Sequence, residues 1–378
     1  MTPDPGGPLR VLHVDTGRTW RGGQRQALLL ATALAERGHA SLCAFQARTP
    51  LAREAGAAGL ELVPFACRGE WDLRAALHLR GIVRQRRPHL LHAHDGHAVT
   101  MALVAAAGRA PVVASRRTAF RTRRHPVNRL KLRSVRRWIA ISRAARRGLL
   151  RAGVDPARVD IVPSGVPLEI PARSTARAPA PGLRAALGLP ADSFVILTAG
   201  RLEALKGQRT VVEACALGGD LGNTRWVVAG EGPDQAFLER LARSLGVAER
   251  VIFAGPLPDL PGRMPDSQVF VLASFQEGLG SALLDSLAAG VPAIVAEGSG
   301  AAEVVTDGVE GFLTPVGDAR SVAEAVRVLY LDPSRRKEMG SQARLRALAF
   351  SLGATVERTL ASYRAALNAP APPARPDA

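Results

Sequence analysis

The chain alternates short apolar runs with longer stretches in which apolar residues recur every three or four positions. The first pattern is typical of a buried parallel strand, and the second is typical of an amphipathic helix. The strands predicted in the first part of the chain are residues 10–15, 40–45, 60–65, 90–93, 112–114, 138–141 and 159–162. Helices are predicted between them at residues 24–37, 72–85, 99–107 and 142–152. This alternation predicts a doubly wound parallel sheet.

A second set of alternations follows a segment without periodicity. The predicted strands are residues 194–199, 226–229, 251–254, 269–272 and 293–295, and the predicted helices are residues 208–216, 235–245, 281–289 and 319–331. The interpretation is an N-terminal Rossmann-like domain (1–166), a Pro/Ala-rich linker (167–181), a second Rossmann-like domain (182–367) whose last helix can pack back on the first, and a disordered tail (368–378). Because parallel sheets bind ligands at their carboxyl ends, two facing units predict an interdomain cleft.

Charge changes this picture in one region. The net charge is +17, and fourteen Lys or Arg residues without any Asp or Glu lie between Arg116 and Arg151. Such a field attracts polyanions, for example anionic lipid headgroups. With only Phe120 and Trp138 as aromatics in that segment, no nucleic-acid partner is expected.

No apolar stretch is long enough to cross a bilayer, and the first residues, which are rich in Pro and Gly, lack the features of a signal peptide. We therefore expect a cytoplasmic protein. The basic segment can attach it to the inner face of the cytoplasmic membrane. The cysteines, at 43, 67 and 215, are too far apart for a metal or disulfide motif and are interpreted as core residues.

The most informative segment is EGLGSALLDSLAAGVP at 277–292. Its glycine-rich turn leads from a predicted strand directly into a helix, and free amides at a helix N-terminus bind anions. Glu277 is placed to accept hydrogen bonds from sugar hydroxyls, and Asp285, about two turns along the helix, from a ribose diol. The alternative is an ordinary junction with a solvated acid.

Two cations follow another predicted strand. Arg201 and Lys206 lie on one loop, where they can hold both phosphates of a diphosphate and stabilise charge as it leaves. Lysine otherwise occurs only at positions 131 and 337, so an ammonium at 206 is notable in an arginine-rich chain. A solvated loop is the alternative interpretation.

The N-terminal half has weaker signals. Gly22 and Gly23 open the first predicted helix without forming GxGxxG, which argues against a nicotinamide dinucleotide. Histidines crowd into HLLHAHDGH at 89–97, and we favour a polar loop lining the cleft over a metal site there, because no second cluster completes a coordination shell.

Together these motifs resemble a known family. They are similar to motifs of the retaining GT-B glycosyltransferases of family four. The similar motifs are GlyGly at 22–23, VPSGVP at 162–167, RLEALKG at 201–207, GEG at 230–232 and the segment at 277–292, with Glu303 beyond it. The resemblance spans nearly the whole chain and is most specific in the C-terminal half.

The resemblance implies roles for individual residues. Arg201, Lys206 and Glu277 are the implied catalytic residues, the two cations on the donor diphosphate and Glu277 on the transferred sugar. The implied donor-binding residues are Gly230, Glu231, Gly232, Gly278, Leu279, Gly280, Ser281, Ala282 and Asp285. The acceptor-side or cleft residues are Gly22, Gly23, His94, Asp95, Arg116 and Arg117.

The chain departs from the family pattern at two points. The second acid of the paired-glutamate motif is Asp285, and Arg116 and Arg117 stand where many members carry a histidine after the fifth strand. The role of that histidine is absent, moved to His94, or taken by an arginine.

The predicted function is retaining transfer of a hexose from a nucleoside-diphosphate sugar, UDP- or GDP-linked, to a saccharide or lipid-linked acceptor, as in lipopolysaccharide or other cell-envelope synthesis. No metal or cofactor is expected, because Arg201, Lys206 and the helix N-terminus supply the positive potential. The alternatives are a sugar-nucleotide epimerase or hydrolase on the same scaffold, and a non-catalytic polyanion-binding protein.

Overall fold

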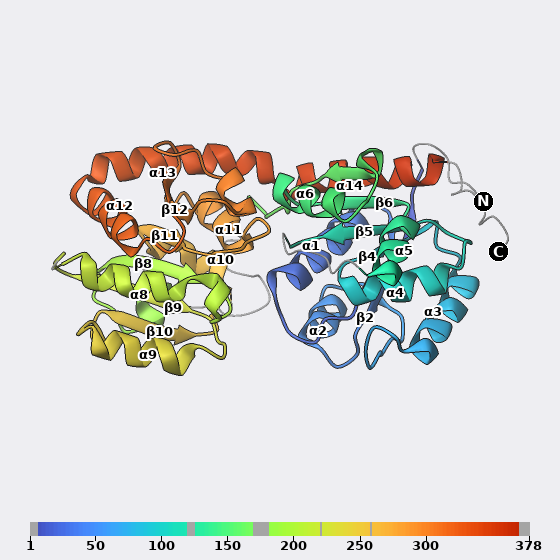
Figure 1. Cartoon of the computed structure of the whole chain (residues 1–378), viewed down its shortest axis with the longest axis horizontal. Coiled ribbons are helices and arrows are strands. Elements are labelled where there is room, and N and C mark those ends of the chain that lie inside the picture. The colour runs from blue at the N-terminus through green and yellow to red at the C-terminus, as the bar shows by residue number, and fades with distance from the viewer. Residues whose placement is uncertain (1–6, 119–124, 169–180, 220, 258, 370–378) are drawn as a thin grey trace. The chain divides into compact units, whose positions relative to one another are not determined.

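The structure is a computed structural model, and it describes residues 7–118, 125–168, 181–219, 221–257 and 259–369. Contacts divide the chain into two compact units (Figure 1). The first unit contains Met1–Gly165 together with Leu352–Ala378, and the second contains Val166–Ser351. The predicted linker and tail lie almost wholly outside the described residues.

The first unit is built on a parallel sheet with the order β3-β2-β1-β4-β5-β6-β7. Its strands are β1 (Arg10–Asp15), β2 (Ala40–Phe45), β3 (Glu61–Leu62), β4 (Leu90–Ala93), β5 (Val112–Arg116), β6 (Arg137–Ala140) and β7 (Val159–Ile161). Its helices are α1 (Gly22–Glu36), α2 (Pro50–Ala57), α3 (Leu73–Arg86), α4 (Gly96–Ala106), α5 (Pro126–Ser134), α6 (Arg143–Arg151) and α14 (Leu352–Asn368). Helices α3 and α4 pack side by side, as do α1 and α14.

The second unit has a parallel sheet with the order β10-β9-β8-β11-β12-β13. Its strands are β8 (Phe194–Ala199), β9 (Thr224–Ala229), β10 (Val251–Gly255), β11 (Val269–Leu272), β12 (Ala293–Ala296) and β13 (Gly311–Thr314). Its helices are α7 (Leu183–Ala186), α8 (Gln208–Leu217), α9 (Gln235–Ser244), α10 (Leu260–Arg263), α11 (Ser281–Ala289), α12 (Ala319–Leu331) and α13 (Pro333–Ala347). Two sheets of this kind confirm the prediction of two Rossmann-like domains.

Strand positions follow the predicted apolar runs closely, but β13 was not predicted and one strand is shorter than expected. The strand expected at residues 60–65 is reduced to Glu61–Leu62, whose two residues are both exposed on the edge strand β3. Proline at position 64 has no N–H for a further ladder bond, which is consistent with the early end of this strand.

The last helix belongs to the first unit because its apolar face completes the core there. Val356, Leu360 and Tyr363 of α14 are buried against residues of α1, β1, β4, β5 and β6. The Tyr363 hydroxyl also contacts Nδ1 of the buried His92 at 2.7 Å. Helix α14 is thus held by apolar packing and by one buried polar contact.

Among the described residues, no helix combines the length and the apolar character needed to cross a bilayer.

We expect Tyr363→Phe to destabilise the docking of α14 by about 1–3 kcal/mol, because it leaves one nitrogen of His92 buried without a partner. Hydrogen–deuterium exchange should accelerate in residues 352–368. Tyr330→Phe is the matched control, since the Tyr330 hydroxyl has no hydrogen-bond partner among the described residues. Equal protection of α14 in Tyr363→Phe and wild type would show that the hydroxyl contributes nothing.

Candidate functional site

The strand order of the second unit reverses between β8 and β11. From β8 the chain runs outward to β9 and β10, and β11 then returns to the other side of β8. Connections that diverge in this way leave a crevice at the carboxyl ends of the two strands, where open α/β sheets bind ligands. The loop carrying Arg201 and Lys206 follows β8, and Glu277 follows β11. The fold therefore gathers these sequence-predicted residues at one edge of one sheet.

The central contact of this site joins Lys206 to Glu277. The Lys206 ammonium lies 2.8 Å from Oε2 of Glu277, and the two side chains are only 26% and 17% exposed. The other carboxylate oxygen, Oε1, accepts the N–H of Gly278 at 3.2 Å. A Lys ammonium has three N–H groups, so this pairing leaves donors for a further acceptor. The pair joins the two sides of the crevice at a fixed point.

Helix α11 begins beside this pair without a capping side chain. Its N-cap is Gly280, which has φ +86°, and its first turn contains no acidic residue. A Cβ at Gly280 would lie 2.8 Å from a methyl of Leu272, so both the backbone conformation and the packing require glycine. The first amides of α11 therefore have no side-chain acceptor among the described residues, which is the arrangement that binds anions.

The structure does not bring Arg201 against Lys206. Its Nε lies 3.3 Å from Glu203 on the same loop, and both of these side chains are more than a third exposed. The Arg201 carbonyl accepts a hydrogen bond from Gln208 at the start of α8. Arg201 thus has a weak solvent-screened partner that a ligand anion can replace.

The GEG motif lies on the loop that follows β9. A Cβ on Gly230 would fall 2.0 Å from the Gly200 carbonyl, and one on Gly232 would fall 2.2 Å from the Leu202 carbonyl. Both glycines are therefore needed for close packing against the loop of Arg201. Glu231 is exposed.

Of the other predicted donor-binding residues, Gly278, Leu279 and Asp285 are buried, whereas Ser281 and Ala282 at the start of α11 are partly exposed. Asp285 is 6% exposed and has an interaction partner within the protein. Its role on the ribose stays a prediction.

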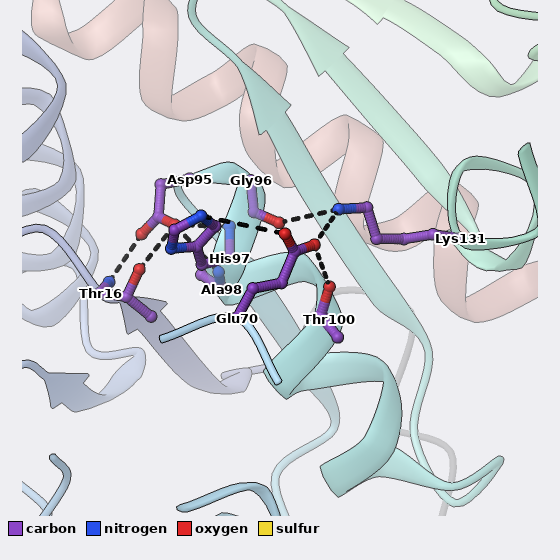
Figure 2. Close-up of polar contacts among 8 residues, drawn as sticks. All are labelled: Thr16, Glu70, Asp95, Gly96, His97, Ala98, Thr100 and Lys131. Atoms are coloured by element: carbon purple, nitrogen blue, oxygen red, sulfur yellow. Dashed lines mark hydrogen bonds and ion pairs between the residues drawn. The ribbon is translucent and has the colours of Figure 1, made fainter. Parts of the chain in front are cut away.

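The first unit reverses its strand order between β1 and β4. Asp95 follows β4 and caps α4, accepting the N–H groups of His97 and Ala98 at 2.9 Å. The same carboxylate accepts the Thr16 N–H at 2.6 Å and the Thr16 hydroxyl at 2.8 Å (Figure 2). Asp95 therefore fixes the loop that leads from β1 to Gly22 and Gly23, where α1 begins without a capping side chain.

A second acidic group beside α4 was not identified from the sequence. Glu70 accepts hydrogen bonds from the Lys131 ammonium at 2.5 Å and from the Thr100 hydroxyl at 2.8 Å, and Lys131 also reaches the Gly96 carbonyl (Figure 2). Burial alone would raise the pKa of Glu70, but these hydrogen bonds hold it below its usual value. The scarcity of lysine was the only signal that could have indicated this contact.

The histidines correct the prediction of a polar loop. His92 lies within β4 and His94 directly after it, and both are buried beside His13 of β1. The ring nitrogens of His13 and His94 are 3.0 Å apart, and His92 lies between the hydroxyls of Tyr363 and Ser115. His13 is the third imidazole that the sequence interpretation lacked.

These three histidines have ligand atoms within 4.8 Å of one another, as a metal site requires. However, Arg117 donates to the Nδ1 atom of His94 at 3.3 Å, so a metal ion there would lie close to a permanent cation. The trio is interpreted as a buried hydrogen-bonded cluster. Arg116 ends β5 and Arg117 follows it, both partly buried.

The two domains match two protein-family models. Residues 20–170 match Glycosyltransferase Family 4, and residues 181–346 match Glycosyl transferases group 1. Together with the fold, these matches place the chain in the class of GT-B glycosyltransferases.

Similar curated proteins include the putative glycosyltransferase EpsD of Bacillus subtilis, 34% identical over 187 residues that are 49% of each chain. The D-inositol 3-phosphate glycosyltransferase of Kineococcus radiotolerans is 35% identical in an alignment 263 residues long, which covers 61% of this chain and 58% of that protein. The present matches thus span about half the length of these curated relatives.

Among solved structures, Anabaena Alr3699/HepE in complex with UDP-glucose superposes with a TM-score of 0.79 at 20% identity, covering 94% of this chain and all of that one. A glycosyltransferase from Rickettsia africae gives a TM-score of 0.81 at 17% identity, covering 96% and 99%. At these identities the likeness shows the GT-B fold.

The buried histidines predict acid sensitivity of the first unit. Burial lowers the pKa of His13 from 6.5 to about 3 and lowers those of His92 and His94 well below 6.5. Below pH 6.5 the unfolded chain therefore binds protons that the folded chain does not, and the stability of the fold decreases as the pH is lowered. Burial of Asp15 raises its pKa to about 6. Between pH 6 and 4 the folded chain therefore binds about one proton at Asp15 that the unfolded chain does not, and this partly offsets the loss of stability caused by the histidines.

We expect urea denaturation of the first unit to shift to lower urea between pH 7 and 5, with a slope of up to about 1.4 kcal/mol per pH unit per histidine. His13→Gln should lower the overall stability and also flatten the slope by about one proton. A pH-independent midpoint over this range would contradict the assignment of neutral buried imidazoles.

Proposed function

We propose that the protein transfers a sugar from a nucleoside-diphosphate sugar to a saccharide or lipid-linked acceptor, with retention at the anomeric carbon. The observation that carries this proposal is the Lys206–Glu277 pair beside the uncapped start of α11, at the strand-order reversal of the second sheet. An ammonium with unused N–H groups is paired with Glu277, which lies beside Gly280 at the start of the row of free amides. Their common complement is a compact group with several anionic oxygens, as in a diphosphate.

The chemistry follows from where charge develops. When the bond between the anomeric carbon and the diphosphate breaks, negative charge grows on the leaving oxygen. Lys206 is held in place by Glu277 and the α11 amides by their helix, so donors that need no rearrangement stabilise the transition state more than the ground state. Arg201, on the same loop and partly exposed, adds a second cation. These groups supply the positive potential, so the proposed reaction needs no metal.

Glu277 has two duties in this proposal. Its Oε2 atom orients Lys206, and Oε1 accepts the Gly278 N–H, so both oxygens already have partners. A carboxylate oxygen has two lone pairs, which leaves acceptor capacity for a sugar hydroxyl. Glu277 thus links the cation on the diphosphate to the sugar that leaves it. Other contacts than these select the base, the sugar and the acceptor.

We expect Lys206→Ala to lower the transfer rate by tenfold or more, because a charge-assisted hydrogen bond is worth about 1.5–3 kcal/mol. Glu277→Gln should lower the rate more than it weakens binding of the nucleoside diphosphate. Lys337→Ala on α13 is a matched lysine control. The assay measures sugar transferred and donor consumed, with and without acceptor. Donor consumption that is indifferent to acceptor would favour an epimerase or hydrolase, and full activity of Lys206→Ala would remove this lysine from the site.

We also propose that α5 attaches the N-terminal domain to an anionic membrane surface. Val127 and Leu130 of this helix are 43% and 53% exposed, and Arg129 and Arg133 are exposed beside them. Apolar side chains flanked by arginine are typical of a helix lying in a lipid interface. Part of the basic segment has other partners, since Lys131 pairs with Glu70 and Arg137 with Asp160. Arg121, Arg123 and Arg124 lie outside the described residues.

Liposome flotation tests this attachment. The wild type should bind vesicles containing anionic lipid at low salt and be released by salt, because the attraction fades beyond a Debye length of roughly 8 Å. The Val127→Ser, Leu130→Ser double variant should bind more weakly. Leu331→Ser with Leu345→Ser is the control, since these leucines are 62% and 60% exposed in the other domain. No binding to anionic vesicles at low salt would favour a soluble saccharide acceptor.

A further inference from the structure

Among the described residues, no carboxylate lies within ion-pair distance of Arg117. Its one hydrogen bond goes from Nη2 to Nδ1 of His94 at 3.3 Å, and its Nε atom is buried with no partner among the described residues. The acid whose charge acts on Arg117 is Asp15, which is fully buried, makes no ion pair with it and already accepts the Gly17 N–H at 2.8 Å and the Gln24 amide. A partly buried guanidinium with unused donors is costly unless an anion completes it.

The histidine cluster fixes the direction of this guanidinium without neutralising it. Arginine can only donate, so Nδ1 of His94 must be the acceptor and the His94 proton must lie on Nε2. That proton is then donated to Nδ1 of His13, 3.0 Å away, which leaves the His13 proton on its buried and unpartnered Nε2. The cluster is held neutral by burial, so it orients Arg117 and leaves the positive charge available.

The location of Arg117 makes this charge relevant to a ligand. It directly follows β5, next to the β1–β4 reversal, and its Cδ lies 3.5 Å from where a Cβ on Gly23 would stand. Gly23 is in the first turn of α1, which is a fifteen-residue helix whose N-cap, Arg21, makes no side-chain cap. The exposed part of this guanidinium and the start of an uncapped helix are therefore grouped at the carboxyl edge of the first sheet, while its Nε atom lies in the interior.

We propose that Arg117 binds a phosphate or carboxylate group carried by a saccharide substrate, with His94 as the positioning residue that sets its orientation. This inference rests on the proposed function and gives it a substrate class, an anionic sugar. The group belongs either to the acceptor or to the transferred sugar, as in a uronic acid. The same fork of N–H donors recognises both phosphate and carboxylate.

Calorimetric titration with inorganic phosphate, glucose 6-phosphate, glucuronate and neutral glucose tests the binding directly. The wild type should bind at least one of the anions about tenfold more tightly than glucose, and Arg117→Gln should remove this preference. Arg74→Gln, an exposed arginine on α3, is the charge-matched control. If Arg117→Gln and wild type bind every probe equally, the inference is overturned.

Two further arms separate the sources and the roles. A preference for UDP-glucuronate over UDP-glucose that is lost in Arg117→Gln assigns the anion to the donor sugar, whereas anion binding that persists with UDP-glucose bound assigns it to the acceptor. His94→Asn keeps an acceptor for Arg117 and should retain more of the preference than His94→Leu. Equal loss in both His94 variants would refute the positioning role.

This inference and the proposed function fail separately. Lys206→Ala should weaken UDP binding and leave the anion preference intact, since Lys206 belongs to the other domain. Sugar transfer that proceeds in Arg117→Gln exactly as in wild type, for anionic and neutral substrates alike, would overturn the inference and leave the glycosyl transfer standing.

Discussion

The constraint on which both sites depend is the reversal of strand order in a parallel sheet. Where the chain leaves neighbouring strands toward opposite sides, no connection covers their carboxyl ends, and the loops there are open to a ligand. The reversal falls between β8 and β11 in one unit and between β1 and β4 in the other. Polar residues collect at both points because backbone amides and helix starts are free there to act on a ligand.

The two reversals are equipped differently. In the second unit an ion pair, Lys206–Glu277, holds the crevice together and places a cation next to free amides. In the first unit the hydrogen-bonded imidazoles of His13 and His94 back the Arg117 guanidinium, and Asp95 fixes the adjoining loop. One arrangement suits a diphosphate that gains charge during the reaction. The other suits an anion that is recognised and not transformed. Such a division of tasks is consistent with a transferase that handles a leaving group in one domain and a second substrate feature in the other.

The fold was predictable because buried parallel strands are continuous apolar runs, which are the clearest pattern in the sequence. Strand β13, the four-residue helices α7 and α10, and the longer helices α2, α5 and α13 were not predicted, and the longer helices were missed for physical reasons. α5 buries only Leu132, and α13 buries small residues such as Gly340 and Ala343, so neither has a strong apolar periodicity. α2 begins with a Thr49 cap and a proline, a signal that was present but belongs to a helix of eight residues.

The candidate site was predictable where a motif is local and less so where contacts join distant segments. Glu277, Lys206 and the start of α11 follow from strand–loop–helix junctions that can be read along the chain. The pairing of Lys206 with Glu277, and the joining of His13 to His94 across 81 positions, arise only when strands become neighbours. Arg117 was identified as a departure from the family pattern. Its contact with His94 could not be predicted without the register of β1, β4 and β5.

The most direct measurement is the affinity of the protein for UDP and GDP compared with that for uridine and guanosine. Lys206 and the start of α11 are assigned to the diphosphate, so one of the two diphosphates should bind at least about a hundredfold more tightly than its own nucleoside, as two phosphates with charge-assisted contacts imply. This difference should shrink with added salt. Nucleosides and nucleoside diphosphates that bind equally would contradict the assignment of Lys206 and the start of α11 to an anion.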